Sequence, residues 1–166
     1  MSLLTDSRVR ENEAETVRRF TSNFPVKVGE LAQELGLNVI RTPLNPNISG
    51  LIKPSEEARA GFEIRVNKYE SSERQRFTVA HEIAHYLLHR DDIGAGVVDS
   101  IMYRSSLTSR KEVEANRLAA DIVMPAKAVS RELERLGGKK TEETAEELAI
   151  KFRVSIPAMK VRLGMT

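Results

Sequence analysis

The stretch FTVAHEIAHYLLH, residues 77–89, contains all 3 histidines of the 166-residue chain. Its apolar residues recur every three or four positions, which predicts a helix buried along much of its length. We expect this helix to begin after Ser71 or Ser72, because serine is a favoured N-cap residue. Histidine and glutamate are costly inside such an apolar helix unless they are paired or bind a metal ion.

His81, Glu82 and His85 form the pattern H-E-x-x-H. Four helical residues advance by about 400°, so the two histidines lie about 40° apart on one face and about 6 Å apart along the axis. Both imidazoles can therefore bind the same ion. Glu82 lies at the edge of this face and can act as a general base without becoming a ligand. This is the arrangement of metal-assisted peptide hydrolysis.

A catalytic zinc ion usually has three protein ligands, so the pattern requires one more. Asp91 is a weak candidate, since Leu88 stands where a glycine would let the helix break and turn back toward the ion. His89 is about 80° around and about 12 Å along the helix from His81. We interpret His89 as a histidine that does not bind the metal.

Better candidates for the third ligand lie in EVEANRLAAD, residues 112–121. On a helix, Glu112 lies about 70° from the centre of the buried stripe, whereas Glu114 lies about 90° away on the other side. Glu112 is therefore favoured, with Glu114 as the alternative. Asn116 follows Glu112 by one turn and is expected to hydrogen-bond a ligating histidine.

The remaining pattern predicts helices on both sides of a short strand-rich region. Within residues 38–67 the strictly alternating GFEIRVN predicts a strand whose Phe62, Ile64 and Val66 face the core and whose Glu63, Arg65 and Asn67 face outward. An extended substrate can pair with such a strand. Helices are expected at about residues 6–22, 26–36, 108–125, 126–136, 141–152 and 156–163.

Composition limits the class of protein. Hydrophobic residues make up 40% and charged residues 30% of the chain, as in folded globular proteins. With 0 cysteines, any metal must be held by nitrogen and oxygen. No apolar run approaches the roughly 18 residues of a membrane span, and the charged start lacks the apolar region of a signal peptide. We therefore expect a cytoplasmic protein with no membrane partner.

The segments RFTVAHEIAHYLLH and EVEANRLAADIVMP, with IRVN before them, resemble the ImmA/IrrE family of zinc-dependent endopeptidases. The resemblance covers about residues 26–125, and more loosely RVSIPAMKVRL. It implies one zinc ion (Zn2+) per chain, held by His81, His85 and Glu112, with Glu82 as the catalytic base. It also implies a protein substrate, a helix-turn-helix repressor whose cleavage derepresses mobile-element or stress-response genes.

The expected fold is α+β. A small mixed or antiparallel sheet packs on a gluzincin-like H-E-x-x-H helix and on the helix of the glutamate ligand, with additional C-terminal helices. Residues 1–125 are expected to form the metallopeptidase core with its N-terminal helices. Residues 126–166 are expected to form a helix-turn-helix-like extension packed on that core. Tyr103 and Arg104 are candidate donors to the oxyanion of the reaction.

The alternative function is that of a DNA-binding regulator with a vestigial metal site. Residues 151–166 contain four basic residues and no acidic one. If Lys160 and Arg162 are exposed on a helix-turn-helix, they can contact the phosphates of DNA. We favour a packing role for this segment, so DNA binding is the less favoured function.

Overall fold

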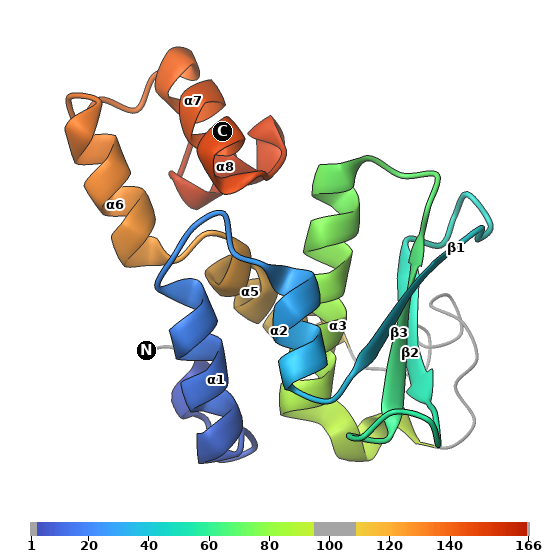
Figure 1. Ribbon diagram of the computed structural model, residues 1–166. Helices are drawn as coiled ribbons and strands as arrows, with labels where there is room; N and C mark the ends of the chain where they lie inside the picture. The colour runs from blue at the N-terminus through green and yellow to red at the C-terminus, as the bar shows by residue number, and fades with distance from the viewer. Residues whose placement is uncertain (1–2, 95–108, 166) are drawn as a thin grey trace.

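The computed structural model describes residues 3–94 and 109–165, which form an α+β fold (Figure 1). Over these ranges the chain has one short 3-10 helix, seven α-helices and a three-stranded sheet. The predicted fold class is confirmed. Tyr103 and Arg104 lie outside the described residues.

The long helix α3, Ser72–Ile93, runs between the sheet on one side and helices α2 and α5 on the other (Figure 1). The hydroxyl of Ser71 caps it by accepting a hydrogen bond from the backbone N–H of Arg74. Residues 78–89 are buried without interruption, because neighbouring elements cover both sides of the helix. His89 has non-helical backbone angles, φ −128° and ψ 24°, which mark a kink near the end.

The sheet has the order β1-β3-β2, formed by Asn38–Thr42, Phe62–Asn67 and Gly50–Pro54. Strand β1 pairs with β3 in parallel and β2 pairs with β3 antiparallel, so the sheet is mixed. Because β3 is central, both of its edges are already used. The prediction that an extended substrate pairs with this strand is therefore wrong.

Two residues of β3 differ from the predicted alternation. Glu63 and Asn67 were expected to face outward, yet their exposed fractions are 8% and 1%. The carboxylate of Glu63 pairs with Arg65 at 2.5 Å. The amide of Asn67 donates to the carbonyl groups of Leu44 and Ile48, at 3.2 and 3.0 Å, and thereby fastens the loop between β1 and β2. Burial of Asn67 follows from these contacts with a loop outside the strand, whereas Glu63 pairs with a neighbour on its own face of β3.

The N-terminal segment begins with η1, Leu3–Thr5, and continues in α1, Glu11–Thr21. This helix starts later than predicted, because a carboxylate oxygen of Asp6 accepts a hydrogen bond from the backbone N–H of Arg8 at 2.9 Å and favours a turn there. Helix α2, Val28–Glu34, follows after a short loop and packs on α3.

Helix α1 is tied to α3 by a buried polar cluster. Glu13 accepts a hydrogen bond from the hydroxyl of Tyr86 at 2.6 Å and forms an ion pair with Arg90. The guanidinium of Arg90 also lies over the ring of Tyr86, 4.3 Å from its centroid. The cluster fixes the position of α1 along the second half of α3.

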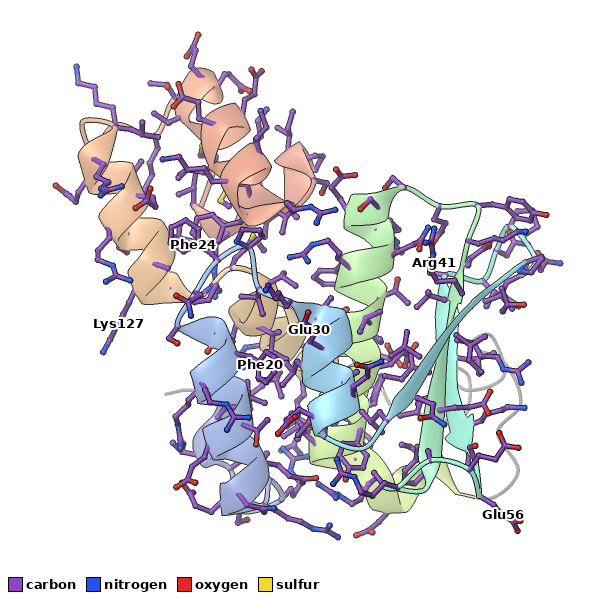
Figure 2. All side chains as sticks on the ribbon, in the orientation of Figure 1. Phe20, Phe24, Glu30, Arg41, Glu56 and Lys127 are labelled. Carbon is purple, nitrogen blue, oxygen red and sulfur yellow. The ribbon has the colours of Figure 1, made fainter. Side chains whose placement is uncertain are left out.

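Helix α5, Ser109–Val123, leads into three C-terminal helices, α6 (Ala126–Arg135), α7 (Glu142–Phe152) and α8 (Ile156–Arg162). These three lie together at one end of the molecule (Figure 1). Phe24 lies beside these helices (Figure 2), and its ring stacks on that of Phe152 with centroids 4.5 Å apart.

The positive charges at the C-terminus are paired within the chain. Lys160 forms an ion pair with Glu142 at 2.5 Å, and Arg162 forms one with Asp121 at 2.7 Å. Arg162 also donates to the carbonyl group of Met124 and is only partly exposed. The DNA-binding alternative, which requires an exposed Arg162, is therefore not supported at this residue. No helix in the described ranges is long and apolar enough to cross a membrane.

Candidate metal centre

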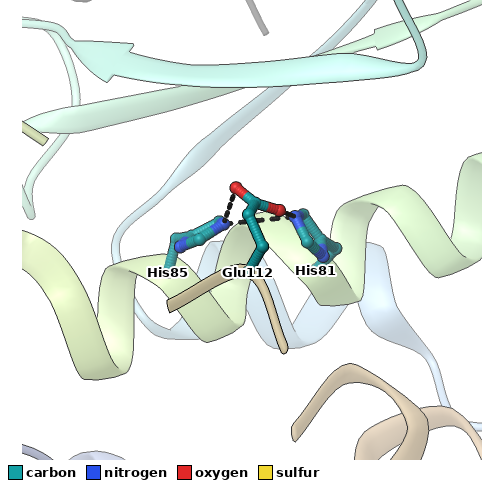
Figure 3. A group of neighbouring side chains, drawn as sticks. All are labelled: His81, His85 and Glu112. Atoms are coloured by element: carbon teal, nitrogen blue, oxygen red, sulfur yellow. Dashed lines mark hydrogen bonds and ion pairs between the residues drawn. The ribbon is translucent and has the colours of Figure 1, made fainter. Parts of the chain in front are cut away.

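Three candidate ligands meet where α3 and α5 pack together (Figure 3). His81 and His85 project from α3, and Glu112 projects from the first turn of α5. The Nε2 atoms of His81 and His85 lie 3.2 Å from the two carboxylate oxygens of Glu112 and 3.1 Å from each other. The three potential ligand atoms all lie within 4.8 Å of one another.

This geometry fits a metal ion. In a tetrahedral zinc site with bonds of about 2.0–2.1 Å, ligand atoms lie about 3.4 Å apart. The spacings of 3.1 and 3.2 Å between the nitrogen and oxygen atoms are close to that value. The donor set of two imidazoles and one carboxylate is also one that catalytic zinc accepts. Glu114, the alternative ligand, is outside this group.

Burial and hydrogen bonds together set the protonation of the cluster. Burial is the main cause that lowers the pKa of His85 to about 4, although a hydrogen bond with Glu112 opposes it. Burial raises the pKa of Glu112, but hydrogen bonds with His81 and His85 outweigh it and bring the pKa well below its ordinary value. At neutral pH the site therefore contains a neutral His85 and an ionised Glu112, the forms that bind a metal ion.

Glu82 and Asn116 lie in different surroundings. Glu82 follows His81 directly on α3 and has an exposed fraction of 1%. Asn116 is exposed and lines the cleft beside the cluster. Within the described residues Asn116 makes no hydrogen bond to a histidine, so the predicted contact is wrong. Its position instead lets it face a molecule in the cleft.

A second layer of polar residues lies behind His85. The Nδ1 atoms of His85 and His89 are 2.9 Å apart, and Nε2 of His89 is 3.0 Å from a carboxylate oxygen of Glu114. Arg8 donates to both carboxylate oxygens of Glu114, at 3.1 and 2.8 Å. This contact is the main cause that lowers the pKa of Glu114 to about 2. Sequence patterns gave no signal for Arg8, which is 106 residues from Glu114.

One cavity adjoins the cluster, and a second, larger cavity lies beside it. The smaller has a volume of about 400 Å³, and His81, Glu112, Asn116 and Phe77 are among its lining residues. The larger, of about 1230 Å³, extends along α5 toward α1, α6 and α8. Phe77 and Asn116 line both cavities, so the two lie side by side, and we call the larger one the groove.

An H-E-x-x-H helix joined by a glutamate from a later helix defines the gluzincin-like arrangement of metallopeptidases. Residues 32–164 match the family described as the IrrE N-terminal-like domain. The chain belongs to this family, as the sequence resemblance predicts.

Known proteins that are similar to the chain include the following two. The radiation response metalloprotease IrrE of Deinococcus radiodurans is 37% identical over 92 residues, which cover 55% of this chain and 27% of that protein. A solved structure described as a Mycobacterium tuberculosis transcriptional regulator aligns with a TM-score of 0.59 and 16% identity, covering 95% of this chain and 48% of that chain. This second likeness concerns the fold. The chain thus spans less than half the length of either protein.

Proposed function

We propose that the chain is a zinc-dependent endopeptidase with His81, His85 and Glu112 as the metal ligands. The observation that carries this proposal is the meeting of three ligand atoms within 4.8 Å where α3 and α5 pack together. Membership of a family that includes a metalloprotease supports the same reading. The predicted set of ligands and the predicted cofactor thus enter the proposal unchanged.

Glu82 is the proposed general base. A bound zinc ion polarises the scissile carbonyl group and makes water a stronger acid. The carboxylate of Glu82 takes the proton of the attacking water and delivers it to the leaving amine.

The groove gives room for an extended peptide. Residues 113–123 of α5 run along it, a helical length of about 16 Å, which matches about five residues of extended chain. Exposed Val113 and Val161, at 56% and 76%, line the groove and offer apolar contacts. A site that holds several residues beside the scissile bond suits an endopeptidase more than an enzyme that trims chain ends.

Charge indicates which peptides bind best. The groove is lined by more basic than acidic side chains. The acidic one is Asp121, and the basic ones are Arg18, Arg117, Lys127, Arg131 and Arg162. Asp121 is already paired with Arg162. Lys127 projects outward from the start of α6 (Figure 2). We therefore propose that acidic residues lie beside the scissile bond of the substrate.

The proposed substrate is a helix-turn-helix transcriptional repressor, cleaved so that mobile-element or stress-response genes are expressed. This part of the proposal rests on the family resemblance of the sequence. Because a repressor acts on the chromosome, the protease would work in the cytoplasm. Residues 1–125 would form its catalytic core, with residues 126–166 packed on that core.

The substitution Glu82→Gln tests the chemistry, because it keeps the shape of the side chain and removes the base. The assay compares cleavage of a partner repressor, or of a peptide mixture analysed by mass spectrometry, at equal zinc content. Loss of a general base costs about 10²–10⁴-fold in rate. Equal cleavage by the variant would reject Glu82 as the base, and no cleavage by the unaltered protein would reject the endopeptidase.

Elemental analysis tests the ligand set. Glu112→Ala is expected to lose zinc, whereas Glu114→Ala keeps a site with weaker affinity. The opposite result would move the third ligand to Glu114.

Substitutions that remove positive charge test whether the groove prefers acidic peptides. Glutamine at Arg117, Lys127 and Arg131 removes three charges from the groove. A control removes three exposed charges elsewhere, at Arg41, Lys139 and Lys140. We expect the groove variant to lose about five- to tenfold in cleavage of acidic peptides, from about 0.3–0.5 kcal/mol per exposed charge. An equal loss in the control would refute the preference for acidic substrates.

A further inference from the structure

Arg74 lies near the start of α3 and lines the smaller cavity, the cleft of about 400 Å³ that adjoins the candidate metal centre. It precedes His81 by about two helical turns, which places both residues on one face of α3 and about 10 Å apart along its axis. A molecule that is bound at the metal centre and extends along the cleft toward the start of α3 therefore comes within reach of Arg74.

The guanidinium of Arg74 is held along one edge. Its Nε and Nη2 atoms donate to the hydroxyl oxygen of Ser49, at 3.3 and 3.2 Å. That hydroxyl group donates its own hydrogen to a carboxylate oxygen of Glu70 at 3.0 Å, so its lone pairs are left for Arg74. Because Ser49 is 6% exposed, its hydroxyl group is a fixed point within the protein. The Nε–Nη2 edge of Arg74 is thereby oriented.

The other edge of the guanidinium is available to a ligand. A guanidinium has more N–H groups than these two contacts use, and its Nη1–Nη2 edge can donate to both oxygens of a carboxylate. Within residues 3–94 and 109–165, Arg74 forms no ion pair with an acidic side chain, and its Nη1 atom donates to no acceptor. Its side chain is also exposed. The charge of Arg74 can therefore be neutralised by a bound molecule.

Arg74 also sets the charge preference at its end of the cleft. Among the described lining residues, Arg74 alone carries a permanent positive charge. The others are Phe77, Thr78, His81, Glu112 and Asn116. In the proposed function the metal ion takes His81 and Glu112 as ligands, and Phe77, Thr78 and Asn116 are uncharged. An acidic group beside the start of α3 would thus meet Arg74 as its partner.

We propose that Arg74 is a specificity-determining residue that binds an acidic side chain of the substrate about three residues from the scissile bond. An extended chain advances about 3.3 Å per residue, so three residues cover the roughly 10 Å between His81 and Arg74. This inference rests on the proposed endopeptidase. It is separate from the charge of the groove, because Arg74 is not among the residues that line the groove.

The first experiment uses the unaltered, zinc-loaded protein. The substrates are neutral peptides with both ends blocked, long enough to fill the cleft and the groove, with one aspartate or one asparagine at successive positions. Aspartate about three residues from the cut should raise kcat/KM about tenfold over asparagine, as expected for a hydrogen-bonded charge pair. The gain should lie in KM, because Arg74 contacts no reacting atom.

Two results would overturn the proposal. One is equal cleavage of the aspartate and asparagine peptides at every position two to four residues from the cut. The other is a preference for a free C-terminal carboxylate at that distance, found with unblocked peptides, together with no preference for an acidic side chain.

The second experiment reverses the charge. Arg74→Glu should prefer lysine to aspartate at the same position of the peptide, which loss of the structural contact with Ser49 would not produce. Arg74→Gln should show no preference and should cleave neutral peptides with unchanged kcat. The control Lys140→Glu makes the same change of charge at an exposed residue outside both cavities, so it should keep the preference for aspartate. An undiminished preference for aspartate in both Arg74 variants would refute the inference.

Binding of the same peptides distinguishes this inference from the proposed function. Fluorescence anisotropy with zinc-loaded protein that carries Glu82→Gln should show about tenfold tighter binding of the aspartate peptide, and Arg74→Gln should remove the difference. Cleavage without a preference at this position would reject the role of Arg74 and leave the endopeptidase. Binding that depends on Arg74, with no cleavage by the unaltered protein, would reject the endopeptidase and leave the carboxylate site. Absence of both would reject both.

Discussion

Removal of the carboxylate of Glu13 should destabilise the protein strongly, although Glu13 is far along the sequence from every candidate ligand. Its side chain is 9% exposed and accepts hydrogen bonds from Tyr86 and Arg90, which belong to α3. Each hydrogen bond with a charged partner contributes about 1.5–3 kcal/mol. The loss of both in Glu13→Ala should therefore cost about 3–5 kcal/mol, the range seen when one partner of a buried ion pair is removed.

A conservative substitution at Glu13 separates the contributions of the two hydrogen bonds to the free energy of unfolding. Glu13→Gln keeps an oxygen that can accept from Tyr86 but removes the charge that Arg90 meets, so it should cost about half as much. Domains of this size have a free energy of unfolding of about 5–15 kcal/mol, so either loss is easily measured. The control is Glu15→Ala, an exposed position on the same helix, which should change stability by less than about 0.5 kcal/mol.

The assay is urea unfolding of metal-free protein, followed by circular dichroism. Metal is left out because a ligand that binds only the folded state would add its own stabilisation. A cost below about 1 kcal/mol for Glu13→Ala would refute the reasoning. It would mean that Arg90 finds an equivalent partner, or that α1 contributes little to the stability of α3.

Three further predictions concern pH, packing and DNA. Metal-free protein should lose stability as the pH falls from about 6.5 toward 4. The pKa of His85 is about 4 in the folded protein, so the histidine of the unfolded chain takes up a proton at a higher pH than the folded one does. Chemical unfolding across this range should show a loss of about 3 kcal/mol in the free energy of unfolding. Gly50→Ala should cost about 1–3 kcal/mol in the same assay, since its Cβ would lie 2.6 Å from a backbone oxygen, whereas Gly29→Ala has open space and should cost nothing. Alanine at Lys160 and Arg162 should leave mobility shifts with duplex DNA unchanged, since both charges are paired within the chain; tight binding that these substitutions abolish would favour the DNA-binding alternative.

The candidate site is predictable from the sequence where its geometry belongs to single helices. The helical repeat fixes the angle between His81 and His85, and it also separates Glu112 from Glu114 on α5. The structure brings the first three together and directs Glu114 to His89. Metal binding by the three residues stays a prediction. The helical repeat predicts only the face of the helix on which each side chain lies.

Contacts between distant segments are not predictable in this way. The alternation of β3 assumes that one face meets water, and it fails at Asn67 because a loop from elsewhere in the chain supplies carbonyl acceptors. The ion pair of Arg8 with Glu114 joins residues 106 positions apart, and no periodic pattern links them. Asn116 was predicted to contact a histidine, but its angle on α5 directs it to the open cleft.

The side chain of Arg76 has a consequence for attempts to exchange parts of this protein with those of its relatives. From α3 it donates to the carbonyl groups of Val26, Phe152 and Arg153, which belong to the loop before α2 and to the end of α7. A chimaera with foreign helices after residue 125 would have to present carbonyl groups where those of Phe152 and Arg153 lie. Otherwise a half-buried guanidinium would lose its acceptors on the helix that carries both candidate histidine ligands. Grafts that include α7 together with α3 should therefore fold more readily than grafts that divide them.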